Sequence, residues 1–286
     1  MDLELKGKVA IVGGGSKGLG RAAAQVLAAE GANVAICSRS KPDLDKAAQE
    51  IRDTTGSDVF AFAGDLDKHD TIRALITETV TRFGRLDIMV NNSGGPPLAR
   101  SHNATEEQWE TALQRSLLFF ARMSREALPH LKKSGAGRII NVLASTVYQP
   151  IPNLALSGVT RMGVIAFAKS LADEVGRDGI LVNNVCPGSI LTERMLSNVT
   201  ARAKELGISV PDALAQRAAA RRRRARALGA VGASSPFSAS ASRPGATRWR
   251  RIACGRGSCR TGSRSPRTGA DRPRPRSAHR GWTPRS

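Results

Sequence analysis

Short apolar runs alternate with longer segments of helical spacing through most of this chain, and this alternation limits the possible folds more than any other feature. Strands that are apolar along their whole length are typical of a parallel sheet that is buried on both faces. The repeated order of strand and then helix predicts an α/β fold with a doubly wound parallel sheet, as one domain over residues 1–215. The six expected strands are Val9–Val12, Asn33–Ser38, Val59–Ala63, Leu86–Val90, Arg138–Leu143 and Ile180–Cys186. The five expected helices are Gly18–Glu30, Asp43–Thr54, Asp67–Phe83, Glu106–Lys133 and Leu154–Val175.

Charge divides the 286-residue chain into two unequal parts. Residues 1–219 hold 26 basic and 23 acidic side chains, as in an ordinary globular domain. The last 67 residues hold 18 arginines, no lysine and one acid, Asp271, and they account for most of the net charge of +20. Arg, Gly, Ala, Pro and Ser dominate residues 216–286 without a helical or strand period, which predicts a disordered tail.

Three explanations of the tail remain open. It is a basic arm for nucleic acid, a disordered linker or targeting extension, or the product of translation in a shifted reading frame. We favour the shifted frame, because Arg, Gly, Ala and Pro have G/C-rich codons and the apolar pattern breaks off abruptly. The tail has few aromatic residues and no lysine, so we do not expect a nucleic-acid partner.

Several classes of protein are excluded by composition. No apolar run reaches about 18 residues, so we expect no membrane-spanning helix and no membrane partner. The N-terminus carries acids and lacks an apolar stretch with a cleavage site, which argues against a signal peptide. Four cysteines are too few for a disulfide scaffold and favour the cytoplasm. Cys254 and Cys259 lack further ligands nearby, so we expect no metal site.

A glycine-rich turn follows the first expected strand and precedes the first expected helix. Glycines let the backbone approach a pyrophosphate closely, and the helix N-terminus offers free N–H groups to its charge. The strand and helix on either side supply the context that this interpretation requires. The expected phosphate-binding residues are Gly14, Ser16, Lys17, Gly18, Leu19 and Gly20.

The end of the second expected strand indicates which dinucleotide binds. Proteins that bind the non-phosphorylated dinucleotide usually have an acidic residue there, which holds the ribose hydroxyls. This chain instead has Ser38 and Arg39, and Lys17 supplies a second positive charge. A guanidinium matches phosphate geometry, so we expect NADP(H), with NAD(H) as an alternative cofactor.

Five segments, including the glycine turn, occur in order and together resemble the short-chain dehydrogenase/reductase family over roughly residues 4–210. The resemblance implies a single Rossmann domain, usually a homo-oligomer, that transfers hydride between nicotinamide and a small carbonyl or alcohol substrate. It also implies a seventh strand after residue 210, which this sequence lacks. The segments are the glycine turn, Gly64–Leu66, Asn91–Gly94, Gly137–Asn141 and Asn184–Thr192.

The family resemblance assigns further cofactor contacts by position. Asp65 and Leu66 would contact adenine, and the turn with Asn91, Ser93 and Gly94 would line the adenosine ribose. The nicotinamide would be bordered by Pro187, Gly188, Ile190 and Thr192.

The catalytic positions depart from the family pattern, which requires Asn, Ser, Tyr and Lys. They hold Ser116, Ala144, Ser157 and Arg161 respectively, with Ser145 next to Ala144. A divergent branch that resembles 3-oxoacyl-carrier-protein reductases has a similar segment, which is Pro152–Arg161 here. Arg161 would still hold the nicotinamide ribose.

The substitutions leave two functions open. A serine hydroxyl is less acidic than a phenol, and an arginine is always charged, so general acid catalysis worth roughly 10²–10⁴-fold is impaired. Tyr148, the single tyrosine, is either a pocket wall or a replacement proton donor. The chain is then an NADP(H)-dependent oxidoreductase with Ser145, Ser157, Arg161, Ser116 and Tyr148 near the reacting oxygen, or a catalytically silent NADP(H)-binding protein.

Overall fold

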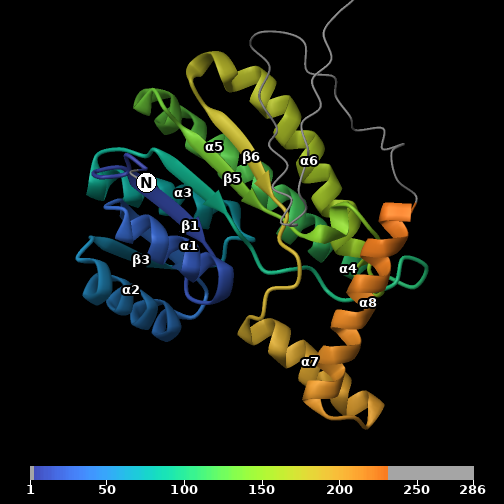
Figure 1. Cartoon of the computed structure of the whole chain (residues 1–286). Coiled ribbons are helices and arrows are strands. Elements are labelled where there is room, and N and C mark those ends of the chain that lie inside the picture. Colours follow the sequence, from blue (N-terminus) through green and yellow to red (C-terminus); the bar gives the residue numbers. More distant parts are fainter. Residues whose placement is uncertain (1–2, 231–286) are drawn as a thin grey trace, which may run out of the picture. The chain divides into compact units, whose positions relative to one another are not determined.

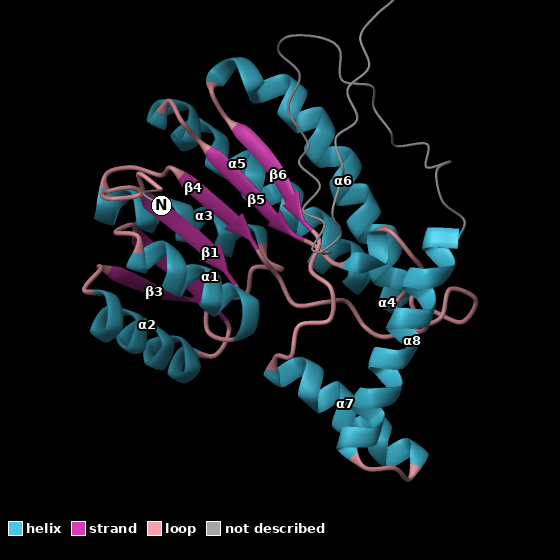
Figure 2. Ribbon diagram, in the orientation of Figure 1, coloured by secondary structure: helices cyan, strands magenta, loops and turns pink. Residues whose placement is uncertain are grey.

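The computed structural model describes residues 3–230, with side chains described as far as residue 220. Six parallel strands form one sheet in the order β3-β2-β1-β4-β5-β6 (Figures 1 and 2). This is the expected doubly wound Rossmann fold, and chain order reverses direction between β1 and β4. The strands are β1 (Val9–Gly13), β2 (Asn33–Ser38), β3 (Val59–Ala63), β4 (Ile88–Asn91), β5 (Arg138–Val142) and β6 (Leu181–Val185).

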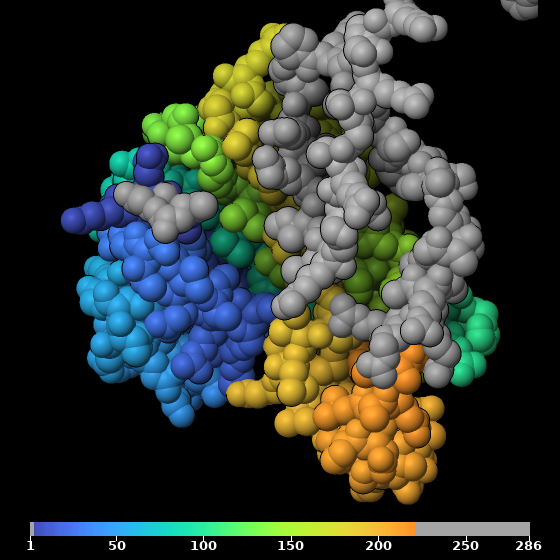
Figure 3. Space-filling view, in the orientation of Figure 1, coloured from blue at the N-terminus to red at the C-terminus, as the bar shows by residue number. Residues whose placement is uncertain are grey.

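Helices cover the two faces of the sheet through two separate apolar cores. Helices α1 (Gly18–Ala29) and α2 (Lys41–Thr55) pack on one face, and their surface is blue in Figure 3. Helices α3 (His69–Phe83), α5 (Phe119–Ser134) and α6 (Ala155–Val175) pack on the other face. Alternate strand residues serve the two cores, as in Ala10 and Ile11.

The long helix expected over Glu106–Lys133 is interrupted. Helix α4 (Glu106–Leu113) runs into a π-helical turn, η1 (Gln114–Leu118), before α5 begins. Thr105 caps α4 through a reciprocal capping box with Gln108. Two 3-10 turns, η2 (Ser145–Val147) and η3 (Gly176–Asp178), flank α6. A π-turn interrupts regular helical spacing, so periodicity alone gave one helix instead of three elements.

Two helices after β6 were not expected. They are α7 (Glu193–Leu206) and α8 (Val210–Ala230). Helix α8 runs past residue 215, the expected end of the ordered domain, and the chain stays helical through residue 230. Alanine and arginine are strong helix formers even without an apolar period, which explains the difference. The rest of the tail, with Cys254, Cys259 and Asp271, lies outside the described residues.

Buried Asp87 fastens the central strands together. Its carboxylate, 2% exposed as a residue, accepts the backbone N–H of Val9 at 2.9 Å. Arg85 donates to both of its oxygens at 2.8 and 2.7 Å. The charge-assisted pair holds the start of β1 against the segment that leads into β4.

Candidate functional site

One cleft lies at the carboxyl ends of the strands, where sheet order reverses between β1 and β4. Its volume is ≈ 970 Å³, and its wall includes the loops after all six strands. Open α/β sheets bind their ligands at such a switch point. The cleft is large enough for a dinucleotide and a small second ligand.

The glycine turn forms one end of the cleft. Gly14 and Gly18 have φ of +61° and +57°, which side-chain-bearing residues rarely adopt. Gly20 does not line the cleft, but a Cβ there would overlap the carbonyl oxygen of Gly14 and lie 2.7 Å from Asn92 Nδ2. Asn92 in turn donates to the Gly13 carbonyl at 3.0 Å.

No side chain caps the N-terminus of α1, so its first N–H groups stay available to a ligand. The turn therefore has the close backbone approach and free donors that a pyrophosphate needs. Five of the six expected phosphate-binding residues line the cleft, and they are Gly14, Ser16, Lys17, Gly18 and Leu19.

Two cations were expected near the 2′-phosphate, and the structure separates their roles. Arg39 is exposed beside the cleft and forms no ion pair within the described part of the chain. Lys17 instead lies 2.9 Å from Asp43 and 3.9 Å from Glu193, and Asp43 raises the pKa of this lysine. Both partners are substantially exposed, so the Lys17 pair contributes little to stability.

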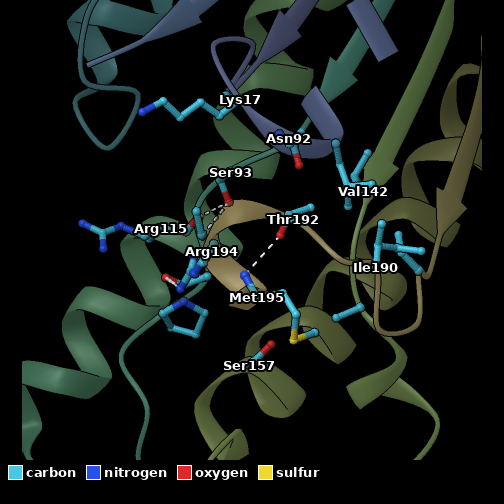
Figure 4. Close-up of a pocket in the computed structure, with 18 of the residues that line it drawn as sticks. Lys17, Asn92, Ser93, Arg115, Val142, Ser157, Ile190, Thr192, Arg194 and Met195 are labelled. Atoms are coloured by element: carbon cyan, nitrogen blue, oxygen red, sulfur yellow. Dashed lines mark hydrogen bonds between the residues drawn. The ribbon is translucent and has the colours of Figure 1, made fainter. Parts of the chain in front are cut away.

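The remaining expected cofactor residues also border the cleft, with one exception. The loops after β2, β3, β4 and β6 bring together Ser38, Asp65, Leu66, Ser93, Gly94, Pro187, Gly188, Ile190 and Thr192. Burial raises the pKa of Cys37 to about 12, so this thiol in the cleft wall stays neutral. Thr192 also caps α7, because its hydroxyl accepts the Met195 N–H at 3.3 Å (Figure 4).

Asn91 is the exception, because it does not line the cleft. The residue is fully buried and outside the cleft. Its amide donates to Ser124 at 3.1 Å and to Asn141 at 2.9 Å, and Asn141 donates to Asn184 at 2.9 Å. Successive strand residues point to opposite faces, so Asn91 joins three strands while its neighbour Asn92 faces the glycine turn.

Ser145, Ser157 and Arg161 line the opposite end of the cleft. Ser157 and Arg161 are each 5% exposed, and the Ser157 hydroxyl lies 3.4 Å from that of Thr146. Arg161 Nη1 donates to the Val142 carbonyl at 2.9 Å, while its Cζ lies 5.9 Å from the centroid of the Phe120 ring. Burial, with the charge of Arg194, lowers the pKa of Arg161 to about 10.

Two other expected catalytic residues lie outside this cluster. Ser116 is fully buried within the π-turn, where its hydroxyl has no hydrogen-bond partner among the described residues. Tyr148 is 72% exposed, outside the cleft, and hydrogen-bonds to Cys186. The cleft therefore has serine hydroxyls and a guanidinium at this end, and no phenol.

Arg194 is one cleft residue that the sequence analysis missed. It lines the cleft from the first turn of α7 and donates to the Gly95 carbonyl at 3.4 Å. A cation in the first turn opposes the helix dipole, and this unfavourable placement was the available signal. Asp67 and Arg115 were also missed; they pair at 2.8 Å in the cleft wall.

A family model described as short chain dehydrogenase matches residues 8–203. The chain belongs to the short-chain dehydrogenase family. Dehydrogenase/reductase SDR family member 4 of Caenorhabditis elegans is 32% identical over 189 residues, which are 66% of this chain and 73% of the relative. A 3-oxoacyl-acyl-carrier-protein reductase of Chlamydia muridarum is 31% identical over 193 residues, covering 68% and 78% of the two chains.

A solved structure of another short-chain dehydrogenase extends the similarity to the fold. The L-sorbose reductase of Gluconobacter frateurii, complexed with NADPH and L-sorbose, superposes with a TM-score of 0.71 at 30% identity. The match covers 74% of this chain and 81% of the reductase. No helix within residues 3–230 of this short-chain dehydrogenase is long and apolar enough to span a bilayer.

Proposed function

We propose that this chain is an NADP(H)-dependent oxidoreductase that interconverts a small carbonyl compound and its alcohol. The observation that carries the proposal is the continuity of one cleft, from the glycine turn after β1 to Ser145, Ser157 and Arg161. Membership of an oxidoreductase family and the NADPH held by the sorbose reductase support it.

The residues present fit the cofactor. Glycines whose Cβ atoms would block the turn, together with the uncapped start of α1, provide a pyrophosphate cradle. Arg39 would bind the 2′-phosphate, and the residues from Pro187 to Thr192 would border the nicotinamide. When bound, the cofactor supplies or accepts the hydride.

Ser145 and Ser157 would hydrogen-bond to the substrate oxygen at the other end of the cleft. The Thr146 hydroxyl, 3.4 Å from that of Ser157, would orient it. Arg161 holds its own proton up to a pKa of about 10, so it would not protonate the oxygen. The proton would therefore come from water or a serine hydroxyl, and we expect turnover below that of relatives with a phenol.

A second candidate is a catalytically silent NADP(H)-binding protein. The observation that favours it is the composition of the cleft, because the single tyrosine of the chain lies outside it. This candidate keeps every cofactor contact and differs in chemistry alone.

The test is a fluorescence titration of the purified chain with NADPH and with NADH, followed by NADPH oxidation over a panel of carbonyl compounds. Saturable binding that prefers NADPH, with turnover of at least one carbonyl, supports the oxidoreductase. Binding without turnover over the whole panel supports the silent protein. Absence of NADPH binding would refute both candidates.

A further inference from the structure

Arg161 carries a buried charge that no acidic side chain compensates. Its Nη1 is used by the Val142 carbonyl, and its Nε has no partner among the described residues. Acidic side chains within residues 3–220 form no ion pair with it. A buried guanidinium without an anion is costly, so the position favours a ligand that brings one.

Arg194 brings a second uncompensated charge to the same cleft. Its guanidinium donates to the Gly95 carbonyl at 3.4 Å, which is a weak contact. The side chain lies between Ser93 and Met195 in Figure 4. The positive charge of Arg194 adds to burial in lowering the pKa of Arg161. Arg161 and Arg194 repel each other and have no acidic partner among the described residues, so a bound anion would stabilise both.

Arg115 shows the contrast within the same wall. It also acts on Arg194 through its charge, but Asp67 accepts from its guanidinium at 2.8 and 3.0 Å. The cleft thus neutralises Arg115 internally, while Arg161 and Arg194 have no acidic partner among the described residues.

We propose that Arg161 and Arg194 bind a carboxylate of the substrate, so that the carbonyl compound reduced here is an oxo acid. This inference rests on the proposed function, since it concerns the substrate end of that cleft. Arg161 follows Ser157 by one helical turn on α6, and side chains at this spacing are neighbours. A carbonyl at Ser157 and a carboxylate at Arg161 must therefore be close in the substrate, as in a 2-oxo or 3-oxo acid.

The experiment compares each acid with its uncharged ester on protein saturated with NADPH. The probes are pyruvate with ethyl pyruvate and acetoacetate with ethyl acetoacetate, followed by the fluorescence of bound NADPH and by its oxidation. We expect at least one acid to bind about 10- to 100-fold more tightly than its ester, the range of a hydrogen bond to a charged group. The fluorescence readout detects binding even if turnover is slow.

Variants of Arg194 separate the substrate from the cofactor. Arg194→Gln should lower the affinity for the oxo acid about 10- to 100-fold and leave the NADPH affinity unchanged. Arg194→Lys should restore part of the lost affinity. Arg202→Gln is the matched control, because Arg202 is on the same helix, outside the cleft, and pairs with Glu205. Thermal melts check that each variant is folded.

Equal affinity for acid and ester would overturn the inference and leave the proposed function standing. The same holds if Arg194→Gln lowers the affinity for NADPH as much as the affinity for the oxo acid. Absence of NADPH binding by the unaltered chain would overturn both.

Discussion

Under the proposed function, Arg39 would bind the 2′-phosphate and favour NADPH over NADH. It is exposed at the end of β2, beside the cleft, while neighbouring Lys17 is held by Asp43. We expect Arg39→Ala to weaken NADPH binding about 10- to 100-fold, because a charge-assisted contact to the 2′-phosphate is lost. NADH binding should stay the same, as measured by fluorescence titration.

Lys41→Ala is the control for Arg39, since Lys41 is an exposed cation two residues along that pairs with Asp45 and does not line the cleft. Equal loss of NADPH and NADH affinity in Arg39→Ala would contradict the assignment.

In the proposed oxo-acid site, Arg161 would determine the pH dependence of substrate binding. Burial lowers its pKa to about 10, and Arg194 adds to the effect. Cys186, which also faces it, has a pKa raised by burial and stays neutral at lower pH. The lowered pKa still lies well above neutral, so Arg161 keeps its charge and oxo-acid affinity should be flat between about pH 6 and about pH 9. Fluorescence titrations of the NADPH complex across this range measure it, and a loss centred near neutral pH would exclude Arg161 as the controlling group.

At the scale of elements, the junction of β1 and α1 depends on Gly20. A Cβ there would overlap the Gly14 carbonyl oxygen, which is backbone and cannot rotate away. We expect Gly20→Ala to reduce NADPH affinity at least about tenfold and to destabilise the fold by about 1–3 kcal/mol, through displacement of the glycine turn. Titration and urea unfolding measure the two effects.

Gly176→Ala provides the comparison for Gly20, because a Cβ at Gly176 would meet nothing within 4 Å and the residue has an ordinary helical φ of −58°. Similar behaviour of the two variants would argue that the turn tolerates a side chain.

The attachment of β1 to β4 depends on Asp87. Asp87→Ala would leave the buried Val9 N–H and the Arg85 guanidinium without their acceptor. We expect a loss of about 2–4 kcal/mol in the free energy of unfolding, measured in urea. Asp70→Ala is the comparison, because Asp70 is 93% exposed and forms a surface ion pair with Arg73. This substitution should lower the free energy of unfolding by less than about 0.5 kcal/mol. Equal losses in the two variants would mean that the buried Asp87 carboxylate stabilises the fold no more than an exposed one.

At the scale of the whole molecule, one face of β6 is left uncovered by the described elements. Leu181 and Val185 are 41% and 49% exposed on the face that α1 and α2 cover elsewhere. Exposed apolar residues on an outer strand favour association between molecules. We expect the double substitution Leu181→Lys and Val185→Lys to reduce light scattering by concentrated protein. The free energy of unfolding should change by less than about 0.5 kcal/mol. Unchanged scattering with unchanged stability would show that this face does not mediate association.

The fold could be predicted from sequence because its signal is local. Each strand is a continuous apolar run, and each flanking helix has a periodic apolar face. Helix α8 was missed because arginine and alanine form helix without that face, and the π-turn was missed because it changes helical spacing for a few residues.

The cofactor end of the site was also predictable, since glycine spacing within one turn determines it. The substrate end was not, because it depends on contacts between distant segments. Arg194 reaches Gly95, 99 residues away in the chain, and Tyr148 and Ser116 fall outside the cluster that their spacing suggested. Asn91 lies one strand residue before Asn92, and this single step reverses the direction of its side chain and leaves it outside the cleft.

The strand order has a consequence for synthesis of the chain on the ribosome. Strands β1 to β4 pair with one another entirely within residues 9–91, and the glycine turn lies among them. Chains fold from the N-terminus as they emerge, so this half of the sheet can assemble before the codons for β6 and the basic tail are read. A change of sequence near the 3′ end of the coding region would therefore affect the nascent chain only after its dinucleotide-binding half has folded.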